Sequence, residues 1–171
     1  ALTLDVFGFV KLTGSLAFKQ ATGNFVLTNG HTSAAWNGVK YLEVGGTVGT
    51  GFAGVGSFGF NLTSLTFGAV LVSDTNNTPT NTSDDTNYMA LKVDVASATL
   101  TGLDGLSASV TSLSVVVNKT SSTPTPNKVL DFVDTAEETT TTDTNAANRS
   151  IVTGPSSANV TLDMDGDEGA R

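Results

Sequence analysis

The stretch LKVDVASATLTGLDGLSASVTSLSVVVN, from Leu91 to Asn118, decides the fold of this chain. It contains no proline, few charges and many β-branched residues. Apolar and small polar residues alternate through most of it, and this period of two is typical of strands with one buried face. Asp104-Gly105, between two leucines, is a hairpin turn signal. The stretch therefore predicts two antiparallel strands joined by a turn.

The alternation changes phase at two places, which indicates local bulges. Within Val95-Ala96-Ser97-Ala98 the apolar positions shift by one residue, as an extra residue in one strand would cause. The long apolar segment from Phe58 to Val72 has a similar slip at Thr63-Ser64.

The whole chain has the composition of a β protein. Thr, Ser, Val and Gly are frequent, and charged residues make up only 14% of the 171 residues. Such residues suit pleated strands and tight turns. We expect an all-β fold, mainly an antiparallel twisted sheet or β-sandwich with long polar loops. A β-solenoid is the alternative, because NLTSL, TLTGL and SVTSL echo one another along the chain.

The domain organisation follows from three polar segments. Residues 1–171 are interpreted as a single all-β repeat domain with long loops at 73–87, 118–128 and 134–150. Leu2 to Leu12 is expected to form one continuous strand. Segments 2–8 and 160–166 share the pattern (Leu/Val)-Thr-Leu-Asp-(Val/Met)-x-Gly, as the ends of a repeat in a tandem array would. We expect the chain to be a segment of a longer protein.

Charge and composition restrict the partners. The net charge is −8, with only eight lysines and arginines, so binding to nucleic acid is not expected. No apolar run approaches the roughly 20 residues of a membrane-spanning helix, so membrane insertion is not expected either.

Catalytic chemistry has no candidate residues in this sequence. The chain contains no cysteine and a single histidine, His31, and it has no Gly-x-Ser-x-Gly motif to present a nucleophilic serine. We therefore expect no enzyme.

Asp163, Asp165 and Asp167 form the most site-like motif, DMDGDEG. Alternating aspartates around a glycine resemble the start of a calcium loop, where carboxylate oxygens surround the ion. Calcium at a repeat junction is one interpretation, and a solvated acidic linker is the other.

Asparagines in predicted loops are candidate glycosylation sites. Each begins an Asn-x-Ser/Thr sequon, which accepts N-linked sugar in a suitable host. These residues are Asn76, Asn81, Asn118 and Asn148.

The apolar blocks, taken in order, resemble a repeat unit of giant bacterial extracellular and surface proteins of the adhesin-like, repetitive kind. The resemblance rests on LDVFGFVKLTGSLAF, LTSLTFGAVLVSD, YMALKVDVASATLTGLDGLSASVTSLSVVVN, KVLDFV and SIVTGPSSANVTLDMDG. It implies an extracellular, cell-surface location and a structural or adhesive role. We expect a repeat of a fibre, sheath or large surface adhesin whose copies, or adjacent repeats, join head-to-tail through strand edges. The alternative is a calcium-assisted carbohydrate-binding or adhesive module.

Overall fold

The computed structural model describes residues 2–6, 10–29, 33–75, 81, 83, 85–121, 128–133, 147–155 and 159–171. Strands account for most of them, and every strand pair is antiparallel. The expected all-β fold with an antiparallel sheet is therefore confirmed.

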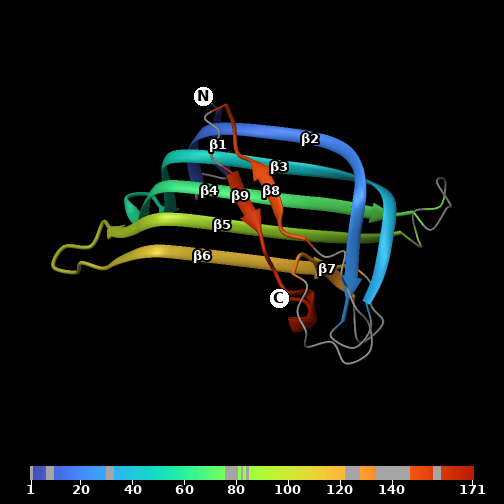
Figure 1. The fold of residues 1–171 in the computed structure, drawn as a ribbon. Coiled ribbons are helices and arrows are strands. Elements are labelled where there is room, and N and C mark those ends of the chain that lie inside the picture. The colour runs from blue at the N-terminus through green and yellow to red at the C-terminus, as the bar shows by residue number, and fades with distance from the viewer. Residues whose placement is uncertain are drawn as a thin grey trace.

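Six strands form an open meander in which each strand pairs with the next one along the chain (Figure 1). Antiparallel pairing of consecutive strands rules out the stacked rungs of a solenoid. The sequence predicted one continuous strand from Leu2 to Leu12, and this prediction is wrong. Leu2–Val6 instead pairs antiparallel with Val10–Gly14. The strands are β1 (Leu2–Val6), β2 (Val10–Thr28), β3 (Ser33–Val55), β4 (Phe58–Asp74), β5 (Thr86–Thr101) and β6 (Ser109–Thr120).

The end of the chain supplies a small second layer. β7 (Val129–Asp131) pairs with the far end of β2, where β2 and β3 curve away from the sheet (Figure 1). β8 (Arg149–Val152) and β9 (Asn159–Leu162) form a hairpin that crosses one face of the sheet, and the short 3-10 helix η1 (Gly166–Glu168) follows.

The main core lies between this second layer and the sheet. Two glycines let the hairpin approach the strands, since a Cβ at Gly45 would meet the carbonyl oxygen of Val152 at 2.1 Å and one at Gly68 would meet Ile151 at 2.9 Å. The core comprises Phe25, Leu27, Tyr41, Val70, Val72, Tyr88, Ala90, Leu130, Phe132, Ile151, Leu162 and Met164.

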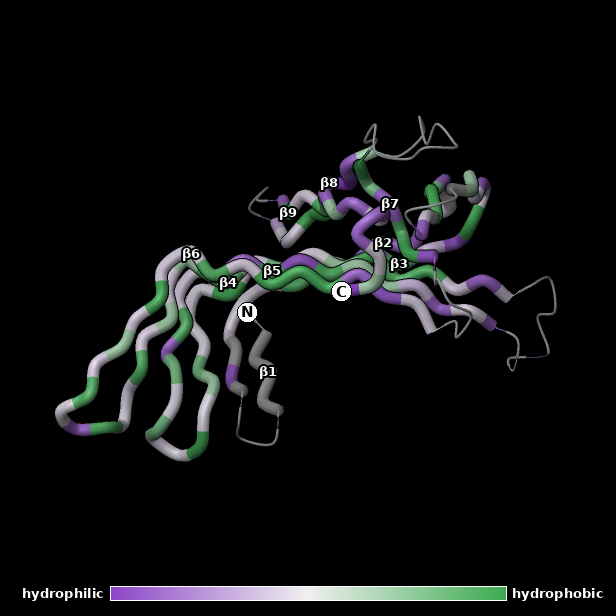
Figure 2. The backbone as a smooth tube through the Cα atoms, turned by 90° about the horizontal axis from the view of Figure 1, so that it is seen from below, coloured by the Kyte–Doolittle hydropathy of each residue, from purple (hydrophilic) through white to green (hydrophobic). Residues whose placement is uncertain are grey.

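A bend crosses the sheet at one row of residues. Gly49, Ser64, Ala96 and Ser112 occupy matching positions on β3 to β6, between paired neighbours on either side. Ser64 and Ser112 have positive φ angles, 49° and 58°. The phase slips predicted at Thr63-Ser64 and within Val95–Ala98 lie at this row. The bulge predicted within Val95–Ala98 is wrong, because the pairing of β4, β5 and β6 keeps one register on both sides of the row and none of these strands carries an extra residue. Figure 2 shows the sheet turning sharply, away from β8 and β9.

We call the two sides of the bend the platform and the flap. The platform carries β8 and β9 and consists of residues 15–28, 33–48, 65–74, 86–95 and 113–120. The flap consists of residues 50–63 and 97–111 and ends in two turns. The turn predicted at Asp104-Gly105 is confirmed: Gly105 has a φ of 78°, and the amide of Leu106 lies 3.5 Å from the carbonyl oxygen of Leu103.

The polar loops are shorter than predicted because the strands run into them. β4 extends to Asp74 and β5 begins at Thr86, so the first loop is not 73–87. β6 extends through Asn118 to Thr120, and β8 already begins at Arg149.

Candidate interaction surfaces

An apolar face of the platform lies opposite β8 and β9. Adjacent residues of a strand point to opposite faces, so the sequence neighbours of the core residues gather here: Leu71 lies between Val70 and Val72, which are both in the core. We call this surface, together with its continuation on the flap, the inner face. On the platform its apolar part consists of Leu16, Phe18, Leu42, Val44, Gly46, Val48, Leu65, Phe67, Ala69, Leu71, Met89, Leu91, Val93, Val95, Leu113, Val115 and Val117. Gln20 and Lys119 lie on the same face, paired with Leu42 and Met89.

The inner face continues around the bend onto the flap. In the corner, Val48, Leu65 and Val95 form a small cluster against which Leu62, from the flap, packs. This contact shows that the flap turns toward the inner face and makes it concave. The flap contributes Val55, Phe58, Phe60, Leu62, Ala98, Leu100 and Val110.

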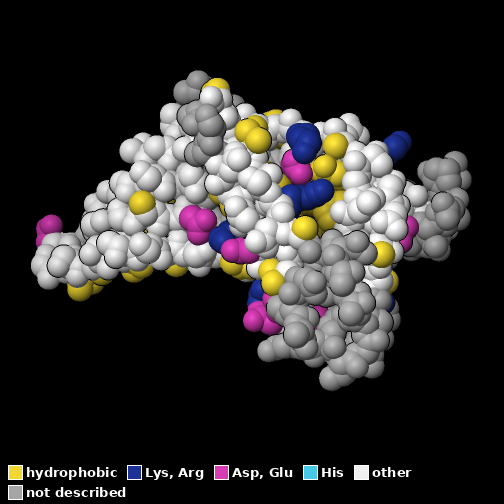
Figure 3. All heavy atoms as spheres, in the orientation of Figure 1, with side chains coloured by type: hydrophobic (Ala, Val, Ile, Leu, Met, Phe, Trp, Pro, Cys, Tyr) yellow, Lys and Arg dark blue, Asp and Glu magenta, His cyan; other side chains and the backbone are white. Residues whose placement is uncertain are grey.

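The described part of the chain leaves much of this apolar surface uncovered. Phe18 is 66% exposed, Val55 63% and Val115 44%, whereas Val70 in the core is fully buried. Figure 3 looks onto the opposite side, where charged side chains gather beside the β8–β9 hairpin. The inner face is thus half of a sandwich core without its second layer.

The edge of β6 is a second uncovered feature. At Asn118 this edge pairs with the end of the chain, because the Asn118 amide donates to the Arg171 carbonyl (2.8 Å) and the Arg171 amide donates back (2.9 Å). Residues of the same parity, Val116 and Ser114, also point their amide and carbonyl groups outward. In the described part of the chain, β6 pairs only with β5 from Ser109 to Val117.

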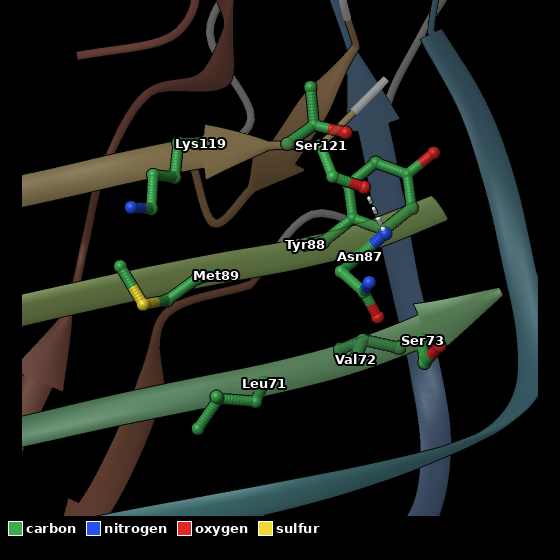
Figure 4. Close-up of a pocket in the computed structure, with 9 residues that line it drawn as sticks. Leu71, Val72, Ser73, Asn87, Tyr88, Met89, Lys119 and Ser121 are labelled. Atoms are coloured by element: carbon green, nitrogen blue, oxygen red, sulfur yellow. Dashed lines mark hydrogen bonds between the residues drawn. The ribbon is translucent and has the colours of Figure 1, made fainter. Parts of the chain in front are cut away.

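A cavity of about 490 Å³ opens where β4, β5 and β6 end. Leu71, Met89 and Lys119 lie side by side on these three strands, and the Asn87 amide donates to Ser121 Oγ at 2.8 Å (Figure 4). Tyr88 also lines the cavity, and burial, followed by the nearby Asp74 carboxylate, raises its pKa. The cavity joins the end of the inner face to the rim of the core.

A charged cluster fastens the β8–β9 hairpin to the sheet. Glu43 is 5% exposed, and its carboxylate lies 3.0 Å from Lys19 Nζ and 3.7 Å from Arg149 Nε. The Arg149 guanidinium stacks over Phe25 and Tyr41, 4.4 and 4.5 Å from the ring centroids. Lys19 donates a hydrogen bond to the Glu43 carboxylate. This bond, followed by the negative charge of the carboxylate, raises the pKa of Lys19. These contacts hold β8 against the sheet and have a structural role.

The three aspartates of the predicted calcium motif have different partners. Asp163 accepts two contacts from Lys92 Nζ, at 2.8 and 3.1 Å. Asp165 caps η1 by accepting from the Asp167 amide, and Asp167 accepts from Thr28 Oγ1 at 2.7 Å. No cluster of three candidate metal ligands occurs among the described residues. Calcium stays a prediction, which thermal unfolding with calcium and with chelator can test.

The glycosylation candidates have different surroundings. Asn118 does not lie in a loop, as predicted: it is a fully buried residue of β6, and its Nδ2 donates to the Leu130 carbonyl at 2.6 Å. The loop placement of Asn118 is therefore wrong, and a glycan there would have to displace core residues. Asn81 and Asn148 are exposed, and Asn76 lies outside the described residues.

No family model, curated protein or solved structure matches the chain. In the described part, no helix is long and apolar enough to cross a membrane.

Sequence reasoning missed both the inner face and the charged cluster. Two signals were present: a run, Ala69-Val70-Leu71-Val72, that is apolar on both faces of a strand, and a single acid in the apolar segment Tyr41–Val44.

Proposed function

We propose that this chain is a structural assembly module: a repeat unit of an extracellular fibre, sheath or surface adhesin whose copies associate through strand edges. The observation that carries the proposal is the uncovered edge of β6. Among the described residues, β6 pairs only with β5 from Ser109 to Val117. The backbone groups that point outward, such as those of Ser114 and Val116, can pair with a strand of a neighbouring copy, which would extend the sheet by main-chain hydrogen bonds.

The pairing of Asn118 with Arg171 supports this mode of association. There a short segment already adds to the β6 edge through two reciprocal backbone bonds. An incoming strand would make the same bonds at Val116 and Ser114. Long strands, an open sheet and few charges suit a module that transmits contacts rather than one that performs chemistry.

The test replaces one outward-facing donor. Ser114→Pro removes an amide that points away from β5, so the β5–β6 ladder stays intact, and proline is tolerated on an edge strand in that position. Ser114→Ala is the matched control. Sedimentation velocity and negative-stain electron microscopy of the purified chain should show extended assemblies for the wild type and the control, and short ones for Ser114→Pro.

Two results would contradict the proposal. One is a wild-type chain that stays monomeric at every concentration. The other is a Ser114→Pro variant that forms assemblies as long as those of the wild type. Labelling of intact producing cells with an antibody to the chain tests the extracellular location, and signal only after lysis would count against it.

A further inference from the structure

We propose that the inner face binds the inner face of a second copy of this chain, so that two open sheets close into one sandwich. The inference rests on the proposed assembly function and deepens it, because it names a second contact, distinct from the β6 edge. The contact is isologous: the same patch serves both partners.

The chemistry of the inner face fits another inner face. Most of its positions on β2 to β6 hold aliphatic or aromatic side chains or glycine. Gln20 and Lys119 lie at the two ends of one outer row, and none of the paired positions holds an Asp or Glu. The chain as a whole carries a net charge of −8, so two copies repel one another except where their surfaces are neutral. A mainly apolar face without carboxylates, with Lys119 at its rim, is therefore where two copies can meet.

The size of the inner face matches a stable dimer. A strand spacing of about 4.8 Å and a rise of about 3.3 Å per residue give the platform part roughly 600 Å² and the flap roughly 300 Å² of flat area. Specific interfaces bury about 800 Å² on each partner. The outline of the inner face and the area of such an interface are therefore of similar size, although the corner residues Val48, Leu65 and Val95 are already buried.

The bend shapes the surface for such a partner. Because the flap turns toward the inner face at the Val48, Leu65 and Val95 cluster, the surface is closed at one end and open along the platform. Packed sheets lie about 10 Å apart with aligned strands. A second sheet placed at this distance would cover the exposed side chains of Phe18, Leu71 and Val115 together.

The test compares lysine substitutions on the two faces of the same strand. Val115→Lys places a charge on the inner face, and Thr111→Lys places the same charge on an exposed residue of the outer side of the flap. Phe18→Lys repeats the test on β2, far from the β6 edge. By sedimentation equilibrium, Val115→Lys and Phe18→Lys should weaken dimerisation by at least about tenfold, because each would bury an unpaired charge. Thr111→Lys should leave it unchanged.

A second measurement uses the absence of native cysteine. A single cysteine introduced as Val115→Cys should become protected from a water-soluble thiol reagent as the protein concentration rises. Thr111→Cys should stay reactive throughout.

The outcomes separate this inference from the proposed function. The inference alone would be overturned if Val115→Lys and Phe18→Lys still form dimers, or if Thr111→Lys weakens dimerisation as much as they do.

Ser114→Pro tests the two proposals together. If this variant forms dimers but no longer assemblies, the result supports both the β6-edge contact and the inner-face contact. A chain that is monomeric throughout would overturn both, and a monomer that binds neutral phosphatidylcholine vesicles through the inner face would replace the second copy with a lipid surface.

Discussion

The two faces of the platform are built from the same strands, but one is buried and the other is partly exposed to solvent. Val70 and Val72 of β4 lie under the β8–β9 hairpin and are almost completely buried, whereas Leu71, between them, is 41% exposed. The sequence supplies apolar residues to both faces, and the described part of the chain covers only one of them. Apolar alternation therefore shows which faces need a partner, and the topology decides whether the partner is intramolecular.

The largest expected effect contrasts a covered leucine with an uncovered one. Leu130→Ala removes a fully buried core side chain and should lower the free energy of unfolding by about 2–5 kcal/mol. Leu71→Ala should cost less than about 1 kcal/mol, because part of its side chain is already in water. Urea unfolding at concentrations where the chain is monomeric measures both, and equal losses would mean that the two faces do not differ as described.

Next in size is the contact between the hairpin and the platform. A methyl group at Gly45 would collide with the backbone of Val152, so Gly45→Ala should displace β8 and destabilise the fold by about 1–3 kcal/mol. Gly49→Ala, on the same strand, is the control, since a Cβ there would meet nothing within 4 Å. Hydrogen exchange of the β8 and β9 amides should rise in the first variant alone. Unchanged protection in Gly45→Ala would show that the hairpin does not need this close approach.

These comparisons separate what sequence can supply from what it cannot. The phase slips at Ser64 and at Ala96 are readable in the sequence, because the alternation of apolar residues changes phase within each strand. Their alignment into one bend depends on the register of β4 against β5, which no single strand encodes. Likewise, the run from Ala69 to Val72 indicates that β4 is apolar on both faces. The residues that pack over one of these faces, Ile151 and Val160, lie much later in the chain.

The wrong placement of Asn118 has a similar origin. The polar residues after Asn118 indicate a loop, yet pairing with Ala90 on β5 extends β6 through that position. Pairing across the sheet therefore overrides the local polar pattern. The aspartates at 163, 165 and 167 each have a different partner, and calcium stays a prediction.

A smaller effect is expected at the bend that makes the inner face concave. Ser64 has a φ of 49°, where β-branched residues are strongly disfavoured. Ser64→Val should therefore lower the free energy of unfolding by about 1–2 kcal/mol, while Ser64→Gly should be tolerated. Thermal unfolding of both variants measures this, and a tolerated valine would place the bend elsewhere.

The smallest effect is a pH dependence confined to the covered side. Burial raises the pKa of Tyr88 above its usual value of 10.0, so the folded state resists losing this proton. The stability from this group is present below pH 10 and is lost as the pH rises through the folded pKa. Tyr88→Phe should flatten the alkaline fall in stability, and ultraviolet titration of the phenolate should show one late-titrating tyrosine in the wild type. A fall of the same steepness in Tyr88→Phe would assign it to other groups.

The pairing of β7 with β2 has a consequence for how the chain acquires its structure. β1 to β6 can form hairpin by hairpin from contacts that are close in sequence, which is a fast process. The main core, however, needs Leu130, Phe132, Ile151, Leu162 and Met164, all from the last part of the chain. A nascent chain emerging from its amino end therefore presents a sheet that is bare on both sides until β7, β8 and β9 arrive. During that interval aggregation competes with folding, and the completion of the carboxyl-terminal segment, rather than the meander, sets the yield of native protein.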